Sequence, residues 1–234
     1  MIQANLKEVE QNILTACNKC GRSRDEITLI AVSKTKPVSM LEDAYSAGIR
    51  NFGENKVQEL TAKLADNAYE GAPVHFIGHL QTNKVRQVVG KVDLIQSVDR
   101  LKLLDAIQAE AAKQGIRQDI LLEINIGGEE SKSGFSPEEL PQVLANMGSY
   151  PNVFVRGLMT IPPICQNPGD NDKFFQKMFH LSVDISTKKY DNVSVKILSM
   201  GMSDDYTDAI RCGATMIRVG TAIFGARDYT KQHP

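Results

Sequence analysis

The chain is organised around the stretch Ile27-Thr-Leu-Ile-Ala-Val-Ser-Lys34-Thr-Lys36-Pro37. Its apolar run ends in two lysines and a proline, which is typical of a fully buried parallel strand that reaches the edge of its sheet. Alternation along a strand predicts that Lys34 shares a face with the apolar residues before it, whereas Pro37 turns Lys36 toward the loop. A lysine in apolar surroundings loses its proton more easily, and the neutral amine attacks aldehydes. Lys34 is therefore a candidate reactive amine, although a solvated lysine at a strand end has the same local pattern.

Composition limits the classes of protein that fit. The chain has 234 residues and a formal net charge of -1, and it is 42% hydrophobic and 24% charged. These values predict a soluble chain with a single domain over residues 1–234, and no positive field that would attract nucleic acid or an anionic membrane. Strand-sized apolar runs and a charged N-terminal stretch indicate neither a membrane span nor a signal peptide. We therefore expect a cytoplasmic protein, and a monomer, without nucleic-acid or membrane partners.

The four cysteines Cys17, Cys20, Cys165 and Cys212 are scattered, which fits a reducing compartment. Cys17 and Cys20 have the spacing of metal and redox sites, but no second such pair and no histidine pair completes four ligands. They fall in the last turn of a predicted helix that ends at Gly21. We expect structural thiols and no metal site.

Strand-like and helix-like segments alternate along the chain. A helical stripe over residues 4–19 precedes the first strand. Further strands are expected at residues 51–55, 74–80, 94–98, 120–126, 153–161, 197–203 and 216–224. Helices are expected from Ser39 as N-cap to residue 47, at 57–64, 83–89 and 101–113, from Ser136-Pro137 onward, and at 174–183 and 206–212. Eight such units without a long linker predict an α/β fold, a closed (β/α)8 TIM barrel with an extra N-terminal helix. A doubly wound open sheet is the alternative, but its GxGxxG signature is missing after the first strand.

In a (β/α)8 barrel, active groups lie at the carboxyl ends of the strands. The residues expected at or near those ends, which could converge on one pocket, are Lys34, Asn55, His79, Asn125, Ser203, Arg218 and Gly220. The last two strands have the pattern of a phosphate site, because Ser203 precedes a helix and Gly220-Thr221 offers backbone N–H groups and a hydroxyl. A plain helix N-cap is the alternative role for Ser203.

Other polar residues in the strands have less specific patterns. Arg218 lies within an apolar strand and needs a partner, either a carboxylate or an acceptor atom of a ligand. His75 and His79 share a strand face, but without a third ligand they are expected to be polar or pocket-lining residues rather than a metal pair. Asn55 and Asn125 are either pocket residues or strand-end caps, and the sequence does not separate these two roles.

Motifs spread over nearly the whole chain carry a resemblance to a known family. They are Ala31-Val-Ser-Lys34-Thr-Lys36-Pro37, Asn51-Phe-Gly-Glu-Asn55 with Val57-Gln-Glu59, His75-Phe-Ile-Gly78 with Leu80-Gln-Thr-Asn-Lys84, Ser131-Lys-Ser-Gly134, Arg156-Gly-Leu-Met159, Ser199-Met-Gly-Met-Ser-Asp204 and Arg218-Val-Gly-Thr-Ala-Ile-Phe-Gly225. The chain resembles the pyridoxal phosphate homeostasis protein family. The resemblance implies a fold similar to the N-terminal barrel of alanine racemase. It also implies binding of pyridoxal 5'-phosphate (PLP) as a Schiff base, no established catalysis, and a role in vitamin B6 balance and, through it, in amino-acid and keto-acid metabolism.

The same resemblance implies roles for six residues. Lys34 matches the PLP lysine of the family. Three residues match the phosphate-binding group: Ser203, Gly220 and Thr221. Arg218 matches the arginine that faces the pyridine nitrogen, and Asn55 a polar residue beside the ring. His79 departs from the family pattern and receives no role, and no catalytic residue is assigned.

Three functions remain open at this point. A PLP-binding protein would hold the cofactor and release it, with apo PLP enzymes as possible recipients. An amino-acid racemase would need a second base, which alanine racemases take from an additional domain; the chain ends at Pro234, so we expect no such domain, and Tyr206 is the tyrosine nearest to the site in the chain. A PLP-free barrel aldolase using Lys34 is the third reading.

Overall fold

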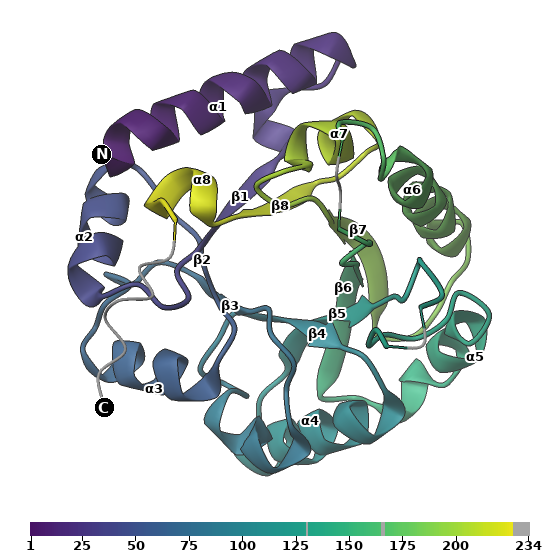
Figure 1. Cartoon of the computed structure of the whole chain (residues 1–234). Helices are drawn as coiled ribbons and strands as arrows, with labels where there is room; N and C mark the ends of the chain where they lie inside the picture. The colour runs from purple at the N-terminus through teal and green to yellow at the C-terminus, as the bar shows by residue number, and fades with distance from the viewer. Residues whose placement is uncertain (130, 165–166, 227–234) are drawn as a thin grey trace.

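Eight parallel strands close into a barrel in sequence order in the computed structural model, which describes residues 1–129, 131–164 and 167–226 (Figure 1). The strands are β1 (Thr28–Val32), β2 (Phe52–Glu54), β3 (Val74–Phe76), β4 (Leu94–Val98), β5 (Gln118–Glu123), β6 (Val153–Met159), β7 (Val193–Ser199) and β8 (Met216–Val219). β1 pairs with both β2 and β8, which closes the sheet. The predicted (β/α)8 barrel is confirmed. Cys165 and Pro234 lie outside the described residues.

Helices surround the barrel and connect its strands. They are α1 (Ile2–Lys19), η1 (Arg24–Glu26), α2 (Val38–Ser46), α3 (Val57–Ala65), η2 (Thr82–Gln87), α4 (Leu101–Gln114), α5 (Leu140–Ala145), η3 (Met147–Ser149), α6 (Asp172–Ser186), α7 (Tyr206–Arg211) and α8 (Thr221–Phe224), where η marks a 3-10 helix. None of the helices in the described part of the chain is long and apolar enough to cross a membrane.

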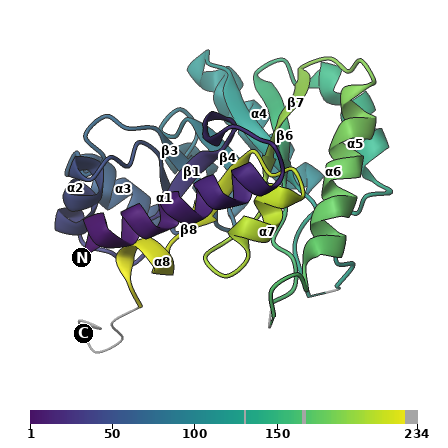
Figure 2. The same ribbon diagram turned by 90° about the horizontal axis from the view of Figure 1, so that it is seen from above.

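The extra N-terminal helix is also confirmed. α1 packs against α2, α7 and α8 on the outside of β1 and β8 (Figures 1 and 2). It buries one apolar stripe, formed by Ile2, Leu6, Val9, Ile13, Ala16 and Cys17. Because burial raises the pKa of the Cys17 thiol, this cysteine behaves as a small core residue. Cys20 is exposed and its thiol donates to the carbonyl of Ala16.

Two apolar layers stabilise the barrel. A small cluster fills its interior and consists of Ile30, Leu94, Leu121, Met159 and Met216. A much larger cluster lies between the sheet and the helices, and it includes the alternate strand residues Leu29 and Ala31. Each large apolar side chain buried in this way contributes roughly 1.5–3 kcal/mol. The interior is therefore packed, and space for a ligand is expected only at the mouth.

Several predicted boundaries were wrong. β8 ends at Val219, where its ladder with β1 ends, and residues 221–224 form α8 instead of continuing the strand. β7 spans Val193–Ser199, and Gly201 turns the chain with a φ of 91°. The segment expected as a helix at 83–89 is the 3-10 helix η2, and the β-branched Val85, Val88 and Val89 within and after it disfavour an α-helix.

Two predicted helix starts also differ. α2 begins at Val38 with Pro37 in the cap position, because the proline ring already fixes a φ of -69°; Ser39 is inside the first turn. After Ser136, residues 137–139 form a turn, and α5 begins at Leu140. Ser136 and Glu139 exchange hydrogen bonds between side chain and backbone across that turn, so the capping signal at Ser136 closes the turn rather than the helix.

Candidate functional site

Lys34 lies in a tight turn rather than on the strand, so its expected alternation with β1 was wrong. β1 ends at Val32, and the Lys36 N–H donates to the Ser33 carbonyl at 3.1 Å, which closes a four-residue turn. Lys34 is half-buried in this turn. The turn bends the chain because Thr35 adopts a φ of 62°.

Lys36 has a structural role. Its ammonium donates to the carbonyls of Phe224, Gly225 and Ala226, each at 3.2 Å. These carbonyls lie at and just beyond the C-terminal end of α8, where a cation is favoured by the helix dipole. Lys36 thus joins the end of α8 to the turn that carries Lys34.

The ends of β7 and β8 meet at the start of α8. The Ser203 hydroxyl accepts hydrogen bonds from the N–H of Gly220 at 3.2 Å and of Ala222 at 3.5 Å. α7 begins only at Tyr206, so Ser203 is not its N-cap. A Cβ at Gly220 would lie 3.3 Å from the Val32 side chain, so a larger residue would fit there only if β1 shifted slightly. The hydroxyl and the first-turn N–H groups of α8 form a site suited to an anion.

Arg218 points into the barrel from β8 and is only 4% exposed. Its Nη1 donates to the Ser199 hydroxyl at 2.6 Å and its Nη2 to the Thr160 carbonyl at 2.9 Å. The sequence predicted that Arg218 needs a partner. In the structure its partners are a hydroxyl and a carbonyl rather than a carboxylate. Burial lowers the pKa of Arg218 to about 10, although Glu123 and Asp205 oppose that shift.

A chain of hydrogen bonds continues from Arg218 across the barrel. The Ser199 hydroxyl donates to Gln96 Oε1 at 2.7 Å, and Gln96 Nε2 donates to His75 Nδ1 at 2.8 Å. His75 therefore accepts at Nδ1, which requires its neutral form with the proton on Nε2. Burial lowers the pKa of His75 to about 4, against a weaker opposing effect of Asp93, in agreement with a neutral ring.

Glu123 is a buried acid inside the barrel at the end of β5. It follows Leu121 of the interior cluster by two residues, so it shares the inward face, and it is 8% exposed. Its pKa is raised to about 7, mainly by burial and also by Asp99, while Arg218 and Lys132 oppose the shift. Glu123 is thus a buried carboxyl that can change its charge near neutral pH.

Asn55 and Asn125 have different roles. Asn125 Nδ2 donates to the carbonyls of Glu129 and Lys132 and thereby holds the loop after β5. Asn55 Oδ1 is buried without a hydrogen-bond partner among the described residues. Gly78 allows the close approach of this segment, since a Cβ there would lie 2.1 Å from the Asn55 carbonyl oxygen. Asn125 is therefore a cap, whereas Asn55 offers an unused acceptor at the end of β2.

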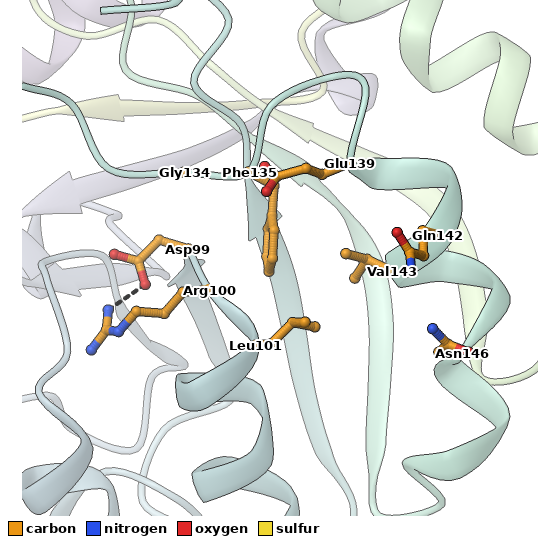
Figure 3. A pocket seen from close by; sticks show the side chains of 9 residues that line it. All are labelled: Asp99, Arg100, Leu101, Gly134, Phe135, Glu139, Gln142, Val143 and Asn146. Carbon is orange, nitrogen blue, oxygen red and sulfur yellow. Dashed lines mark hydrogen bonds and ion pairs between the residues drawn. The ribbon is translucent and has the colours of Figure 1, made fainter. Parts of the chain in front are cut away.

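His79 lies beyond the end of β3, so it does not form a strand pair with His75. Its Nδ1 is 3.2 Å from Asp99 Oδ2, and the other oxygen of Asp99 pairs with Arg100. A neighbouring pocket of about 350 Å³ lies between Arg100 and α5 (Figure 3). Its lining residues are Asp99, Arg100, Leu101, Gly134, Phe135, Glu139, Gln142, Val143 and Asn146. None of the six residues expected to hold the cofactor lines it.

The structure brings Ser203, Gly220 and Thr221 together at one edge of the mouth, with Arg218 below them in the barrel. Sequence reasoning missed Gln96, Ser199 and Glu123 as interior polar groups. The signal was present, because each is a polar residue that directly follows at least two apolar residues of its strand. Among the described residues, no group of three His, Cys, Asp or Glu side chains could hold a metal ion.

The mouth fits a small phosphorylated aldehyde such as PLP. The start of α8 and the Ser203 hydroxyl supply hydrogen-bonding groups for a phosphate. The unpartnered Asn55 oxygen and the buried Arg218 guanidinium offer an acceptor and a donor for a polar ring. Lys34 supplies a primary amine at the same end of the barrel.

The (β/α)8 fold and the polar groups at its mouth define a class of barrel proteins, and comparison with known proteins identifies this class as that of the alanine racemase N-terminal domain. The chain matches the family model described as alanine racemase, N-terminal domain, over residues 4–228. An alanine racemase of Clostridium difficile is 14% identical and has a TM-score of 0.70, covering 97% of this chain and 56% of its own length, and it therefore shares the barrel fold.

Closer relatives narrow the family. The pyridoxal phosphate homeostasis protein of Aquifex aeolicus is 44% identical over 96% of this chain and 97% of its own. The corresponding protein of Haemophilus influenzae is 42% identical over 98% and 97%. The structure of PipY of Synechococcus elongatus with PLP bound is 32% identical, with a TM-score of 0.80 over 96% of this chain and 100% of its own. The chain belongs to the family of pyridoxal phosphate homeostasis proteins.

Proposed function

We propose that the chain binds PLP reversibly through Lys34 and contributes to PLP balance in the cytoplasm as a binding protein rather than as a racemase. PipY, similar to this chain over nearly its whole length, has PLP bound in its solved structure, and this observation carries the proposal. PLP supplies an aldehyde that reacts reversibly with primary amines and a ring that withdraws electrons.

The residues of the chain divide the binding task among them. Ser203, Gly220 and Thr221 would hold the phosphate through a hydroxyl and backbone N–H groups. Arg218 would donate to the ring nitrogen, and because an arginine does not give up its proton to that nitrogen, the ring would remain a weak electron sink. Asn55 would offer its unpartnered oxygen to the ring edge.

Racemisation requires proton removal on one face of the substrate and proton return on the other. The Tyr206 hydroxyl accepts a hydrogen bond from Asn12 of α1 at 3.2 Å, outside the barrel, so this tyrosine is not the second base. A binding protein needs only an amine exchange, in which an incoming amine takes the cofactor from Lys34. Apo PLP enzymes are the proposed recipients, and a monomer is sufficient for this role.

The test incubates the PLP-bound protein with L-alanine and other amino acids in deuterated water. We expect no D-isomer and no exchange of the Cα hydrogen at an enzymatic rate, together with transfer of PLP to an apo-enzyme. Turnover of about one per second or more, within the usual range of enzymes, would favour the racemase instead. Purified protein that takes up no PLP would contradict the proposal as a whole.

A further inference from the structure

The turn that carries Lys34 contains a strained residue. Thr35 is exposed and adopts a φ of 62°, in the third position of a turn where glycine is usual. A β-branched residue with positive φ is a genuine outlier, because its side chain crowds the backbone in that region. Such a conformation persists only where surrounding groups impose it.

Glu59 makes the contact that holds Thr35 in this conformation. It lies in the first turn of α3, and its Oε2 accepts the Thr35 N–H at 2.7 Å. The same oxygen is 3.9 Å from the ammonium of Lys63, one helical turn later. Thr35 is thus tied to a charged group of α3, and Lys63 helps to fix the position of that group.

A buried network holds the start of the same turn. Lys63 is 7% exposed, and its ammonium donates to Glu54 Oε1 at 2.6 Å and to the Ser33 carbonyl at 2.8 Å. The Ser33 hydroxyl donates to the same Glu54 oxygen at 2.6 Å. These bonds anchor Ser33 on β2 and α3, and Glu59 holds the next peptide of the turn, the one between Lys34 and Thr35, through the Thr35 N–H.

We propose that Glu59 is a positioning residue that holds Thr35 at positive φ, so that the turn directs Lys34 toward the cofactor. This inference rests on the proposed binding of PLP at Lys34. Without Glu59 the Thr35 N–H loses its acceptor, and the turn relaxes to a conformation that a threonine prefers. Rotation of the peptide between the two residues then changes the direction in which the Lys34 side chain leaves the backbone.

Three variants test the inference by their affinity for PLP. Glu59→Ala is expected to weaken PLP binding roughly tenfold, the size of effect that this kind of backbone strain supports. Glu59→Gln keeps an oxygen acceptor and should remain within about threefold of wild type. In the Glu59→Ala background, Thr35→Gly should restore binding, because glycine adopts positive φ without support. A general loss of α3 stability would not be rescued by glycine at residue 35.

The matched control is Glu26→Ala. Glu26 also accepts a backbone N–H, that of Ser23 at 2.8 Å, but it lies before β1 at the opposite end of the barrel. The PLP affinity of the Glu26→Ala variant should equal that of wild type. Glu59 has a side chain that is 24% exposed, and Lys63 keeps Glu54 as its partner, so Glu59→Ala should stay folded.

Crystal structures of the cofactor-free wild type and Glu59→Ala variant provide the second readout. Thr35 should leave the positive φ region in the variant only. Unchanged PLP affinity in Glu59→Ala, or a Thr35 that keeps its φ there, would overturn the inference. If the wild type binds no PLP, the proposed function fails, and the φ of Thr35 in the two structures still decides whether Glu59 shapes the turn.

Discussion

Arg218 donates a hydrogen bond from Nη1 to the Ser199 hydroxyl at 2.6 Å inside the barrel. That hydroxyl donates its own hydrogen bond to Gln96 Oε1 at 2.7 Å, so it can only accept from the guanidinium. The direction of every hydrogen bond from Arg218 to His75 is fixed as a result. This order holds the planar guanidinium in one orientation below the proposed ring position.

Ser199→Ala removes the acceptor of a buried charged donor and leaves Gln96 Oε1 without its partner. We expect the free energy of unfolding to fall by about 1–3 kcal/mol, the cost of unpaired buried polar groups. Urea unfolding at constant m value measures the change. The control is Ser182→Ala, where an exposed hydroxyl bonds only to a carbonyl of its own helix, and where the change should stay within about 0.5 kcal/mol. An equally small effect of Ser199→Ala would show that the row of hydrogen bonds through Ser199 does not stabilise the fold.

Glu123 and His75 are expected to give the stability opposite dependences on pH. The pKa of Glu123 is raised to about 7 in the fold, so the folded state binds more protons than the unfolded state between about pH 4.5 and pH 7. Its contribution is present at low pH and is lost as pH rises through that window. The pKa of His75 is lowered to about 4, so its contribution increases as pH rises from about 4 to 6.5.

Glu123→Gln separates the two contributions. Each corresponds to about 3 kcal/mol at its full extent, so in the wild type they largely cancel between about pH 4.5 and 6.5. In the variant the free energy of unfolding should rise as the pH increases over this range. The free energy of the variant relative to that of wild type should also increase with pH, up to about pH 7. Urea unfolding at four pH values, with the exposed Glu138→Gln as control, measures this. Parallel curves for wild type and Glu123→Gln would contradict the raised pKa of Glu123.

The barrel could be predicted because its strands are short apolar runs at regular spacing and its connections are short. The ends of the strands could not, because a ladder stops where the neighbouring strand stops. β8 illustrates this: the run from Val219 to Phe224 is still mostly apolar and strand-like in sequence, yet β1 pairs only as far as Val219 and the chain turns into α8. The sequence of one strand does not show how far the neighbouring strand extends, so it does not show where their pairing ends.

The residues of the candidate site could be predicted where they belong to a short motif in the sequence. Lys34, Ser203 and Gly220 lie just beyond the ends of β1, β7 and β8, whose order along the chain could be predicted. Gln96 and Ser199 each follow two apolar residues in their strands, but their link to Arg218 depends on the closure of the barrel, which brings β4, β7 and β8 to the same interior. The role of Glu59 depends on the φ of Thr35, which no sequence pattern revealed.

Lys36→Met should destabilise the protein without preventing covalent binding of PLP. The substitution keeps the length of the side chain and removes the ammonium that binds three carbonyls around the end of α8. Because Lys36 is half-buried, we expect a loss of about 1–2 kcal/mol in the free energy of unfolding. The exposed Lys102→Met serves as control for the loss of one positive charge. Equal stability of the two variants would remove the structural role of Lys36.

Lys34→Ala tests which lysine holds the cofactor. A link to the PLP aldehyde requires a primary amine, and Lys34 lies in the mouth turn whereas Lys36 binds the end of α8. After incubation with PLP and reduction with borohydride, intact mass should show one adduct in the wild type and in Lys36→Ala, and none in Lys34→Ala. Visible absorbance of the bound cofactor should follow the same order. Lys36→Ala is the matched control because it removes the same group two residues away. An adduct of unchanged yield in Lys34→Ala, located by peptide mapping on Lys36, would transfer the role to that residue and would require the turn to reorganise so that Lys36 leaves α8.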